Sequence, residues 1–259
     1  MILLRSNPKT PGTRHKVYTL NLFEKNKNQK WISIIKKKKM GRSNFNGILT
    51  YSKGKSKMTK YLNINEHKHS INLGLFIKFL HFYKNKTYVG LIKYSNGSFS
   101  VLKAIHGMIP GYFFKNTIFP TSNFVKFYTG SVVFLKWLNR TNIFCNVFND
   151  STKKIMLAKA PGTFCLYINT DEDKDYTRIK IPSGEVKVMY NYLFVTLGRN
   201  SNVWNKRRVL GKAGSNIFAG YKSSVRGIAM NPVDHPHGGR AKTNSPEKTP
   251  WNKIAKKNK

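Results

Sequence analysis

Residue types that can do chemistry are concentrated in one run of ten, Asn231-Pro232-Val233-Asp234-His235-Pro236-His237-Gly238-Gly239-Arg240. His235, His237 and Arg240 offer hydrogen-bond donors, and the carboxylate of Asp234 can orient an imidazole ring. These groups suit phosphates, riboses and base edges in an irregular groove of folded RNA. Two alternatives stay open. One is a metal or nuclease site on Asp234, His235 and His237, although the intervening proline and the shortage of further ligands argue against it. The other is a plain surface loop.

The backbone of this run is unusual as well. Its two prolines restrict φ and remove N–H donors at fixed points. Gly238 and Gly239 lack Cβ atoms, which permits another backbone to approach closely. We therefore expect the main chain, together with the side chain of Asn231, to lie against RNA.

Two other segments combine cations with glycines. The first is Arg207-Arg208-Val209-Leu210-Gly211-Lys212-Ala213-Gly214. It lacks the glycine spacing of a nucleotide-hydrolysing phosphate loop, so phosphate contacts by Lys212 and exposed amides are expected instead. The second is Gly41-Arg42-Ser43-Asn44-Phe45-Asn46-Gly47, with amide side chains and one arginine between flexible ends. It follows the run Lys36–Lys39, for which phosphate contact is the better interpretation in so basic a region.

Composition indicates a polyanionic partner. The 259 residues include 47 Lys and Arg against 10 Asp and Glu, a net charge of +37, and the pI is near 10.3. Self-repulsion of that size destabilises a compact monomer, so nucleic acid is the leading partner and an anionic membrane surface the second. A hydrophobic content of 40% and an aromatic content of 13% argue against a fully disordered chain.

Several protein classes are excluded by what the sequence lacks. Its two cysteines, Cys145 and Cys165, cannot form a zinc cage or a disulfide scaffold, and we expect them to pack inside strands. The longest apolar run, Ile71–Tyr83, has thirteen residues and contains Lys78, whereas a membrane span needs roughly 18–20. The first residues resemble neither a secretory signal nor a transit peptide.

Charge and aromatic residues are distributed in opposite ways. Residues 1–60 and 199–259 together carry a net charge of +27, whereas residues 61–198 carry +10 and most of the aromatic side chains. Basic segments rich in Gly, Pro and Asn cannot bury enough apolar surface to become ordered alone. The sequence therefore predicts a folded centre and two extensions that become ordered against a polyanion.

The centre has the patterns of β-structure. Thr87–Tyr94 and Ser98–Ala104 flank Ser-Asn-Gly, which predicts a hairpin with a two-residue Asn-Gly turn. Tyr176–Ile181 and Glu185–Met189 flank Pro-Ser-Gly and predict a second hairpin. Its first strand alternates, with Thr177, Ile179 and Ile181 on one side and Arg178 and Lys180 on the other, which predicts a half-buried strand. Phe164–Ile168 predicts a further strand. Short strands throughout the centre, without a long capped helix, favour two small barrels over one sandwich.

These segments resemble the universal ribosomal large-subunit protein two family. The most specific match is Val225-Arg226-Gly227-Ile228-Ala229-Met230 together with the run that follows it. Arg208–Gly214, Gly41–Gly47 and the opening Lys9-Thr10-Pro11-Gly12-Thr13-Arg14-His15 match family elements in the same order. The resemblance covers nearly the whole chain, although the central strands match in pattern more than in identity.

The resemblance implies a mainly β fold, in which an OB-fold barrel is followed by an SH3-like barrel, with long basic irregular N- and C-terminal extensions. For this chain it gives an rRNA-binding extension at residues 1–56, an OB-fold RNA-binding domain at 57–124, an SH3-like barrel at 125–198 and a second rRNA-binding extension at 199–259. The boundary between the barrels is expected near Pro120–Lys126.

The resemblance also implies a structural constituent of the large ribosomal subunit and not an enzyme, because peptidyl transfer there is carried out by rRNA. Expected partners are large-subunit rRNA, other ribosomal proteins and the small subunit at an intersubunit bridge. No membrane, metal site or cofactor is expected, apart from structural Mg²⁺ held through rRNA. His235 matches the histidine that the family associates with full peptidyl transfer activity. The residues expected to bind rRNA are Arg14, His15, Gly41, Arg42, Asn44, Asn46, Arg207, Arg208, Gly211, Lys212, Arg226, Asn231, Asp234, His235, His237, Gly238, Gly239 and Arg240.

The chain departs from the family pattern at two places. Residues 52–58, Ser-Lys-Gly-Lys-Ser-Lys-Met, stand where the family has His-x-Gly-Gly-Gly-His-Lys, and Arg240-Ala241-Lys242 interrupts the glycines expected after Gly239. This divergence, with a composition typical of AT-rich coding, favours a mitochondrial location, with a plastid second.

The competing functions are a free single-stranded nucleic-acid-binding OB protein and a metal-dependent RNA-processing enzyme. Charge on the extensions, instead of a barrel groove, favours the ribosomal function.

Overall fold

The computed structural model describes residues 3–19, 33–36, 40–51, 59–62, 64, 73–80, 86–115, 128–149, 154–171, 175–218, 221–239 and 246–255. The chain divides into two compact units. Met1–Lys36 and Met58–Gly211 form the first, which we call the sheet unit. Lys37–Lys57 and Lys212–Lys259 form the second, which we call the basic unit.

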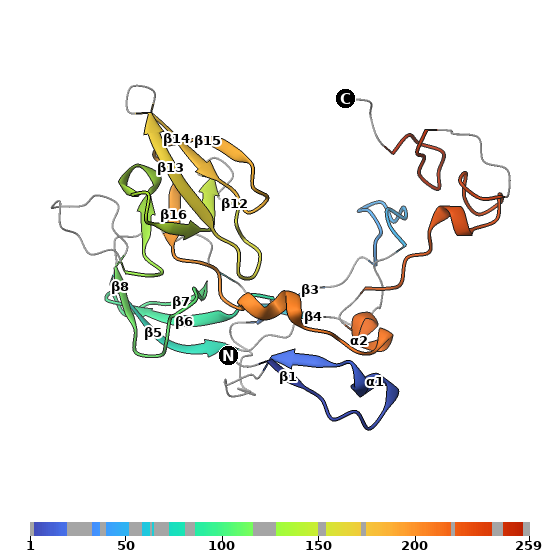
Figure 1. Ribbon diagram of the computed structural model, residues 1–259, viewed down its shortest axis with the longest axis horizontal. Helices are drawn as coiled ribbons and strands as arrows, with labels where there is room; N and C mark the ends of the chain where they lie inside the picture. The colour runs from blue at the N-terminus through green and yellow to red at the C-terminus, as the bar shows by residue number, and fades with distance from the viewer. Residues whose placement is uncertain are drawn as a thin grey trace. The chain divides into compact units, whose positions relative to one another are not determined.

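The fold is mainly β, as predicted, and every strand in the described part of the chain belongs to the sheet unit (Figure 1). The strands are β1 (Leu3–Arg5), β2 (Val17–Thr19), β3 (Ser33–Lys36), β4 (Thr59–Leu62), β5 (Leu73–Leu80), β6 (Val89–Tyr94), β7 (Phe99–Lys103), β8 (Phe113–Lys115), β9 (Val132–Phe134), β10 (Ile143–Cys145), β11 (Val147–Asn149), β12 (Lys154–Leu157), β13 (Cys165–Asp171), β14 (Tyr176–Lys180), β15 (Val186–Tyr190) and β16 (Phe194–Leu197). The helices are short: α1 (Pro11–Arg14), η2 (Leu135–Trp137), η4 (Val203–Arg207), α2 (Ala213–Phe218) and η5 (Gly227–Ala229). None of those described has the length and apolar character to span a membrane.

Two antiparallel sheets contain most of these strands. One has four strands in the order β7-β6-β5-β8, and the other has six in the order β15-β14-β13-β10-β16-β9. The remaining strands form the pairs β1-β2, β3-β4 and β11-β12. The predicted barrel boundary at Pro120–Lys126 lies outside the described residues, between β8 and β9. The OB-fold and SH3-like assignments and the four domain boundaries therefore stay predictions.

Both predicted hairpins form, β6-β7 and β14-β15. The turn of the first is longer than the predicted two-residue Asn-Gly turn. The N–H of Tyr94 donates to the carbonyl of Ser98 at 2.9 Å, which leaves three residues in the loop. Gly97 alone adopts a positive φ, +79°, while the Asn96 side chain accepts the N–H of Ser98 at 3.0 Å. The loop before Glu185 has the same form, with Gly184 at φ +96°.

The alternation predicted for β14 is confirmed. Thr177 and Ile179 are fully buried, whereas Arg178 and Lys180 are exposed. The strand predicted at Phe164–Ile168 is present within β13. Since burial follows the period of two, the sequence pattern placed these side chains on the correct faces.

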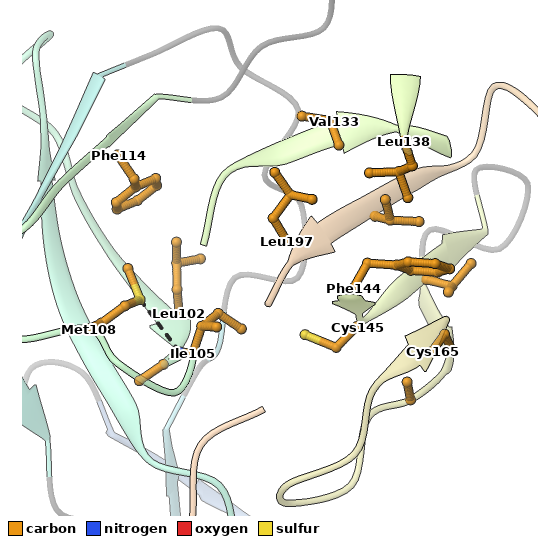
Figure 2. Packing of buried hydrophobic residues seen from close by; sticks show 14 of the residues in the cluster. Leu102, Ile105, Met108, Phe114, Val133, Leu138, Phe144, Cys145, Cys165 and Leu197 are labelled. Atoms are coloured by element: carbon orange, nitrogen blue, oxygen red, sulfur yellow. Dashed lines mark hydrogen bonds between the residues drawn. The ribbon is translucent and has the colours of Figure 1, made fainter. Parts of the chain in front are cut away.

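One apolar cluster joins the two sheets. It contains Leu102 and Phe114 from the four-stranded sheet and Phe144 and Leu197 from the six-stranded sheet. Figure 2 shows these side chains facing a common interior, with Ile105 between the two groups. An isolated backbone bridge from Ile105 to the chain beyond β16 links the sheets further. The sheet unit is therefore held together by a continuous core.

The cysteines pack inside strands, as predicted. Cys145 lies in β10 and Cys165 in β13, and both are fully buried and unpaired with each other. In the sheet, Cys165 is directly opposite Phe144 (Figure 2). Burial raises the pKa of the Cys165 thiol to about 11. Both thiols therefore pack in the interior of the six-stranded sheet.

A buried polar group supports the same core. Asn200 is fully buried, and its Nδ2 donates to the carbonyl of Ala158 at 2.5 Å. Its Oδ1 accepts a hydrogen bond of 3.2 Å from Nδ2 of Asn146. Because a buried carbonyl without a partner is costly, this side chain fixes the path of three segments at once.

Candidate nucleic-acid interface

The run singled out by its chemistry forms a loop that closes on itself in the basic unit. The N–H of Gly238 donates to the carbonyl of His235 at 2.8 Å, and the N–H of Gly239 donates to Met230 at 3.3 Å. At its other end, the N–H of Asp234 donates to the carbonyl of Asn231 at 3.0 Å. We call residues 226–239 the histidine loop. Its shape is set by its own main chain.

Gly238 has a structural role inside this loop. A Cβ atom at this position would overlap the carbonyl of Asn231 and approach that of Met230. Gly239 adopts φ +101°, a conformation that side chains other than glycine rarely take. The close backbone approach predicted for these glycines is thus made within the loop, while their contact with RNA stays a prediction.

His235 is the only buried residue among those described in the basic unit, with 9% of its surface exposed. Its ring packs on Gly227, where an added Cβ would lie 2.7 Å from two ring atoms. Its Nδ1 accepts the N–H of His237 at 3.0 Å. A ring nitrogen that accepts a hydrogen bond carries no proton, so the neutral ring holds its proton on Nε2.

The role proposed for Asp234 is taken by a backbone group. Asp234 is exposed, and the group that orients the imidazole of His235 is the main-chain N–H of His237. The sequence pattern could not distinguish a carboxylate from a backbone donor two residues along. The carboxylate of Asp234 is left at the surface of the histidine loop.

His237 ties the histidine loop to a second turn. Its Nε2 accepts the N–H of Lys248 at 2.9 Å, and its ring centroid lies 4.6 Å from that of His235. Each histidine therefore uses one ring nitrogen as an acceptor for a backbone donor. Binding a metal through those nitrogens would break both bonds, and no cluster of three potential ligands occurs among the residues that the structure describes.

The turn that contains Lys248 is a small hairpin. Lys248 bridges Ile254, and the N–H of Ala255 donates to the carbonyl of Glu247 at 2.7 Å. At its tip, the ring of Trp251 stacks on Tyr51 with centroids 5.8 Å apart and planes at 15°. Segments separated by two hundred residues in the sequence therefore meet in the basic unit through an aromatic pair and not through an apolar core.

Residues Gly41–Thr50 form a third turn of this unit. Arg42 bridges Ile48 across it, and one guanidinium nitrogen of Arg42 donates to the carbonyl of Asn46 at 2.9 Å. Asn46 adopts φ +59°. Two of the predicted RNA-binding residues are thus brought together, although the predicted flexibility is replaced by a hydrogen-bonded turn. The sequence analysis did not include Phe45, which lies at the tip of this turn and is 95% exposed. The available signal for a contact residue was an aromatic side chain among Ser, Asn and Gly.

The sheet unit brings together a second group of predicted residues. Val17 and Val209 exchange backbone hydrogen bonds of 3.1 and 3.0 Å, so the opening of the chain pairs with the segment at 207–211. A Cβ atom on Gly211 would overlap the carbonyl of Gly12. The exposed side chains of this region include Arg14, His15, Arg207 and Arg208, with Lys16 and Lys206 beside them. Parts of both predicted extensions therefore form one exposed cationic region.

For the remaining predicted residues, the structure gives only their exposure and their position in the chain. Lys212 and Arg226 are exposed, immediately before α2 and η5. Arg240 lies outside the described residues, as does the departure from the family pattern at 52–58. Asn44 is exposed in the Gly41–Thr50 turn.

Charge distinguishes the basic unit from an ordinary folded body. Its sequence has 17 Lys and Arg residues against two acids, Asp234 and Glu247. No apolar side chain is buried in its described part. Large apolar groups such as Phe45, Val233 and Ile254 are instead 65–95% exposed. A unit with this surface suits a polyanion that offers both phosphates and flat apolar faces.

Comparison with known proteins gives one consistent result. Residues 128–254 match the family model described as Ribosomal Proteins L2, C-terminal domain. The large ribosomal subunit protein uL2m of Reclinomonas americana is 32% identical over 256 residues, which cover 97% of this chain and 90% of that protein. That of Paramecium tetraurelia is 38% identical over 181 residues, 66% and 69% of the two chains. The large ribosomal subunit protein uL2 of a Wolbachia strain from Culex pipiens is 30% identical over 264 residues, 98% and 94% of the two chains.

Proposed function

This chain belongs to the L2 (uL2) family of ribosomal proteins, and from that membership we propose that it is a structural constituent of the large ribosomal subunit. Its role is to bind large-subunit rRNA, to support assembly and subunit association, and to support the peptidyl transferase region during translation. Its partners are rRNA, neighbouring ribosomal proteins and the small subunit at an intersubunit bridge. In this proposal the four-stranded sheet belongs to an OB-fold barrel and the six-stranded sheet to an SH3-like barrel.

The observation that carries this proposal is the composition of the basic unit. Its 17 cations face two acids, and its described residues include no buried apolar side chain. Such a unit gains little from folding alone, because hydrophobic burial is the main term that offsets chain entropy. Bound phosphates neutralise the repulsion, and RNA surfaces cover the exposed apolar groups. In this proposal RNA therefore supplies both the neutralising charge and the covering surface that the basic unit lacks.

The protein itself performs no proton transfer in this proposal. His235 is held by a backbone N–H on Nδ1 and offers a donor at Nε2, which suits a fixed hydrogen bond to phosphate, ribose or a base edge. No cofactor is required, and Mg²⁺ enters only as a counterion of the rRNA. His235 supports the peptidyl transferase region by position.

The proposed location is the mitochondrion. Two of the relatives above carry the name uL2m, and the sequence is rich in the residues favoured by AT-rich coding. A plastid is the second candidate. Detection of the chain in purified organelle fractions distinguishes the two.

Sedimentation of a cell extract tests the central proposal. The chain should migrate with the large subunit on gradients in both low and high magnesium, because its binding does not depend on the association of the two subunits. Migration near the top of both gradients, with free proteins, would contradict the proposal. Migration with the small subunit alone would contradict it equally.

A further inference from the structure

The turn Gly41–Thr50 is closed by its own hydrogen bonds. The N–H of Ser43 donates to the carbonyl of Gly47 at 2.7 Å, and the N–H of Leu49 donates to Gly41 at 2.8 Å. The guanidinium of Arg42 closes the same turn through the carbonyl of Asn46. The residue at its tip is thus held in a defined direction.

Phe45 is that residue, and its position is unusual. Its side chain is 95% exposed, the highest value among the large apolar residues described. Its N–H donates to Oγ of Ser43 at 3.2 Å, so the backbone beneath the ring is fixed. A phenyl ring that stays exposed to water does not gain the favourable free energy that burial of its apolar surface would give. The geometry therefore calls for a partner that covers the ring.

We propose that Phe45 stacks on an unpaired base of large-subunit rRNA. This inference rests on the proposed function and adds a contact residue to it. Charge selects the partner, since the basic unit carries 17 cations and two acids and repels a basic protein segment. RNA is the partner that combines phosphates with flat apolar faces, and every base offers such a face to an aromatic ring.

The groups around Phe45 match this ligand. Arg42 and Asn46 lie at the base of the turn, and a guanidinium held by one carbonyl keeps further N–H donors for phosphate. Leu49, on the same turn, is 68% exposed but has no π-face. It is a matched control for exposure without stacking.

Binding of the full-length chain to its cognate large-subunit rRNA tests the proposal. Phe45→Ala should weaken affinity about 5- to 150-fold, the equivalent of about 1–3 kcal/mol for one base on one aromatic ring. Phe45→Trp should bind at least as tightly as the original chain, and Phe45→Leu should resemble Phe45→Ala. Leu49→Ala should bind like the original chain. The salt dependence should have the same slope in all variants, because no cation is removed.

Ultraviolet cross-linking of assembled large subunits gives a second readout. A nucleotide adduct should map to Phe45 and disappear in Phe45→Leu. The inference is overturned if Phe45→Leu binds as tightly as the original chain, if Phe45→Ala and Leu49→Ala are equally weak, or if the adduct at Phe45 is a peptide. Failure of the original chain to bind the rRNA at all overturns the proposed function, which separates the two failures.

Discussion

The two units of this protein are both basic but differ in how much apolar surface they bury. The sheet unit has all the described strands and a continuous apolar core that includes Phe76, Phe114 and Phe144. The basic unit, in its described part, has two short helices, three turns and one buried residue, His235. Both are basic, but only the first buries enough apolar surface to offset repulsion. The contrast shows that the sheet unit has an apolar core of its own, whereas the described part of the basic unit has none.

The largest difference in stability should appear between substitutions of two phenylalanines, one buried in the sheet unit and one exposed in the basic unit. Phe144→Ala removes a fully buried ring, and we expect the free energy of unfolding to fall by about 3–5 kcal/mol. Phe45→Ala removes a 95% exposed ring and should change it by less than about 0.5 kcal/mol. Denaturant unfolding of the full-length chain without RNA measures both. Equal losses in the two variants would show that the units do not differ in the way described.

A smaller loss is expected at the polar group inside the same core. Asn200→Ala removes the oxygen acceptor of Nδ2 of Asn146 and one of the two donors to the carbonyl of Ala158, which keeps the N–H of Asn146. Since a buried polar group that loses its partner costs about 1–3 kcal/mol, and only the Asn146 amide does so here, the free energy of unfolding should fall by about that amount. The control is Asn96→Ala in an exposed turn, where water replaces the lost bond. A loss for Asn200→Ala no larger than that for Asn96→Ala would argue that water enters this part of the core.

The fold was predictable where periodicity decides it. Alternation in Tyr176–Lys180 gave both the strand and its buried face, and the apolar types of Cys145 and Cys165 gave their burial. The turn at Asn96 was mispredicted in length, because a dipeptide reports which φ values are allowed but not how the flanking strands pair. Strand pairing is a property of distant segments, and no local signal specified the order β15-β14-β13-β10-β16-β9.

The candidate site was predictable in composition but not in its internal bonds. The run Asn231–Arg240 was recognisable by residue type alone. The sequence could not show that the backbone of His237 orients His235, or that Lys248 holds His237, because backbone donors leave no trace in side-chain identity. Phe45 was overlooked for a related reason, since exposure is decided by the tertiary structure.

Two glycines test whether the basic unit contributes to RNA binding through its shape. A Cβ atom on Gly238 would overlap the carbonyl of Asn231, whereas one on Gly214 in α2 would meet no atom within 4 Å. Gly238→Ala must open the histidine loop, and strain of about 1–3 kcal/mol should appear as weaker binding to rRNA. Gly214→Ala should bind like the original chain, and neither change should alter the unfolding of the sheet unit. Titration with cognate rRNA and denaturant unfolding measure the two properties. Loss of sheet-unit stability in Gly238→Ala would break the separation of the units.

The smallest effect is expected at the one buried side chain of the described basic unit, when its hydrogen bond is kept. In His235→Gln, the amide can keep one of the two hydrogen bonds, either by accepting the N–H of His237 in place of Nδ1 or by donating in place of Nε2. If His235 acts by position, peptide-bond formation per fully assembled large subunit should fall only a few-fold. A general acid or base would instead cost roughly 10²–10⁴-fold on removal. His235→Ala is the complementary variant: it leaves the N–H of His237 without its acceptor and uncovers Gly227, so it should reduce the yield of assembled subunits more than the rate of those that form. A thousandfold loss of rate for His235→Gln in normally assembled subunits would mean that the buried imidazole takes part in the chemistry and that the basic unit is more than a ligand-dependent structure.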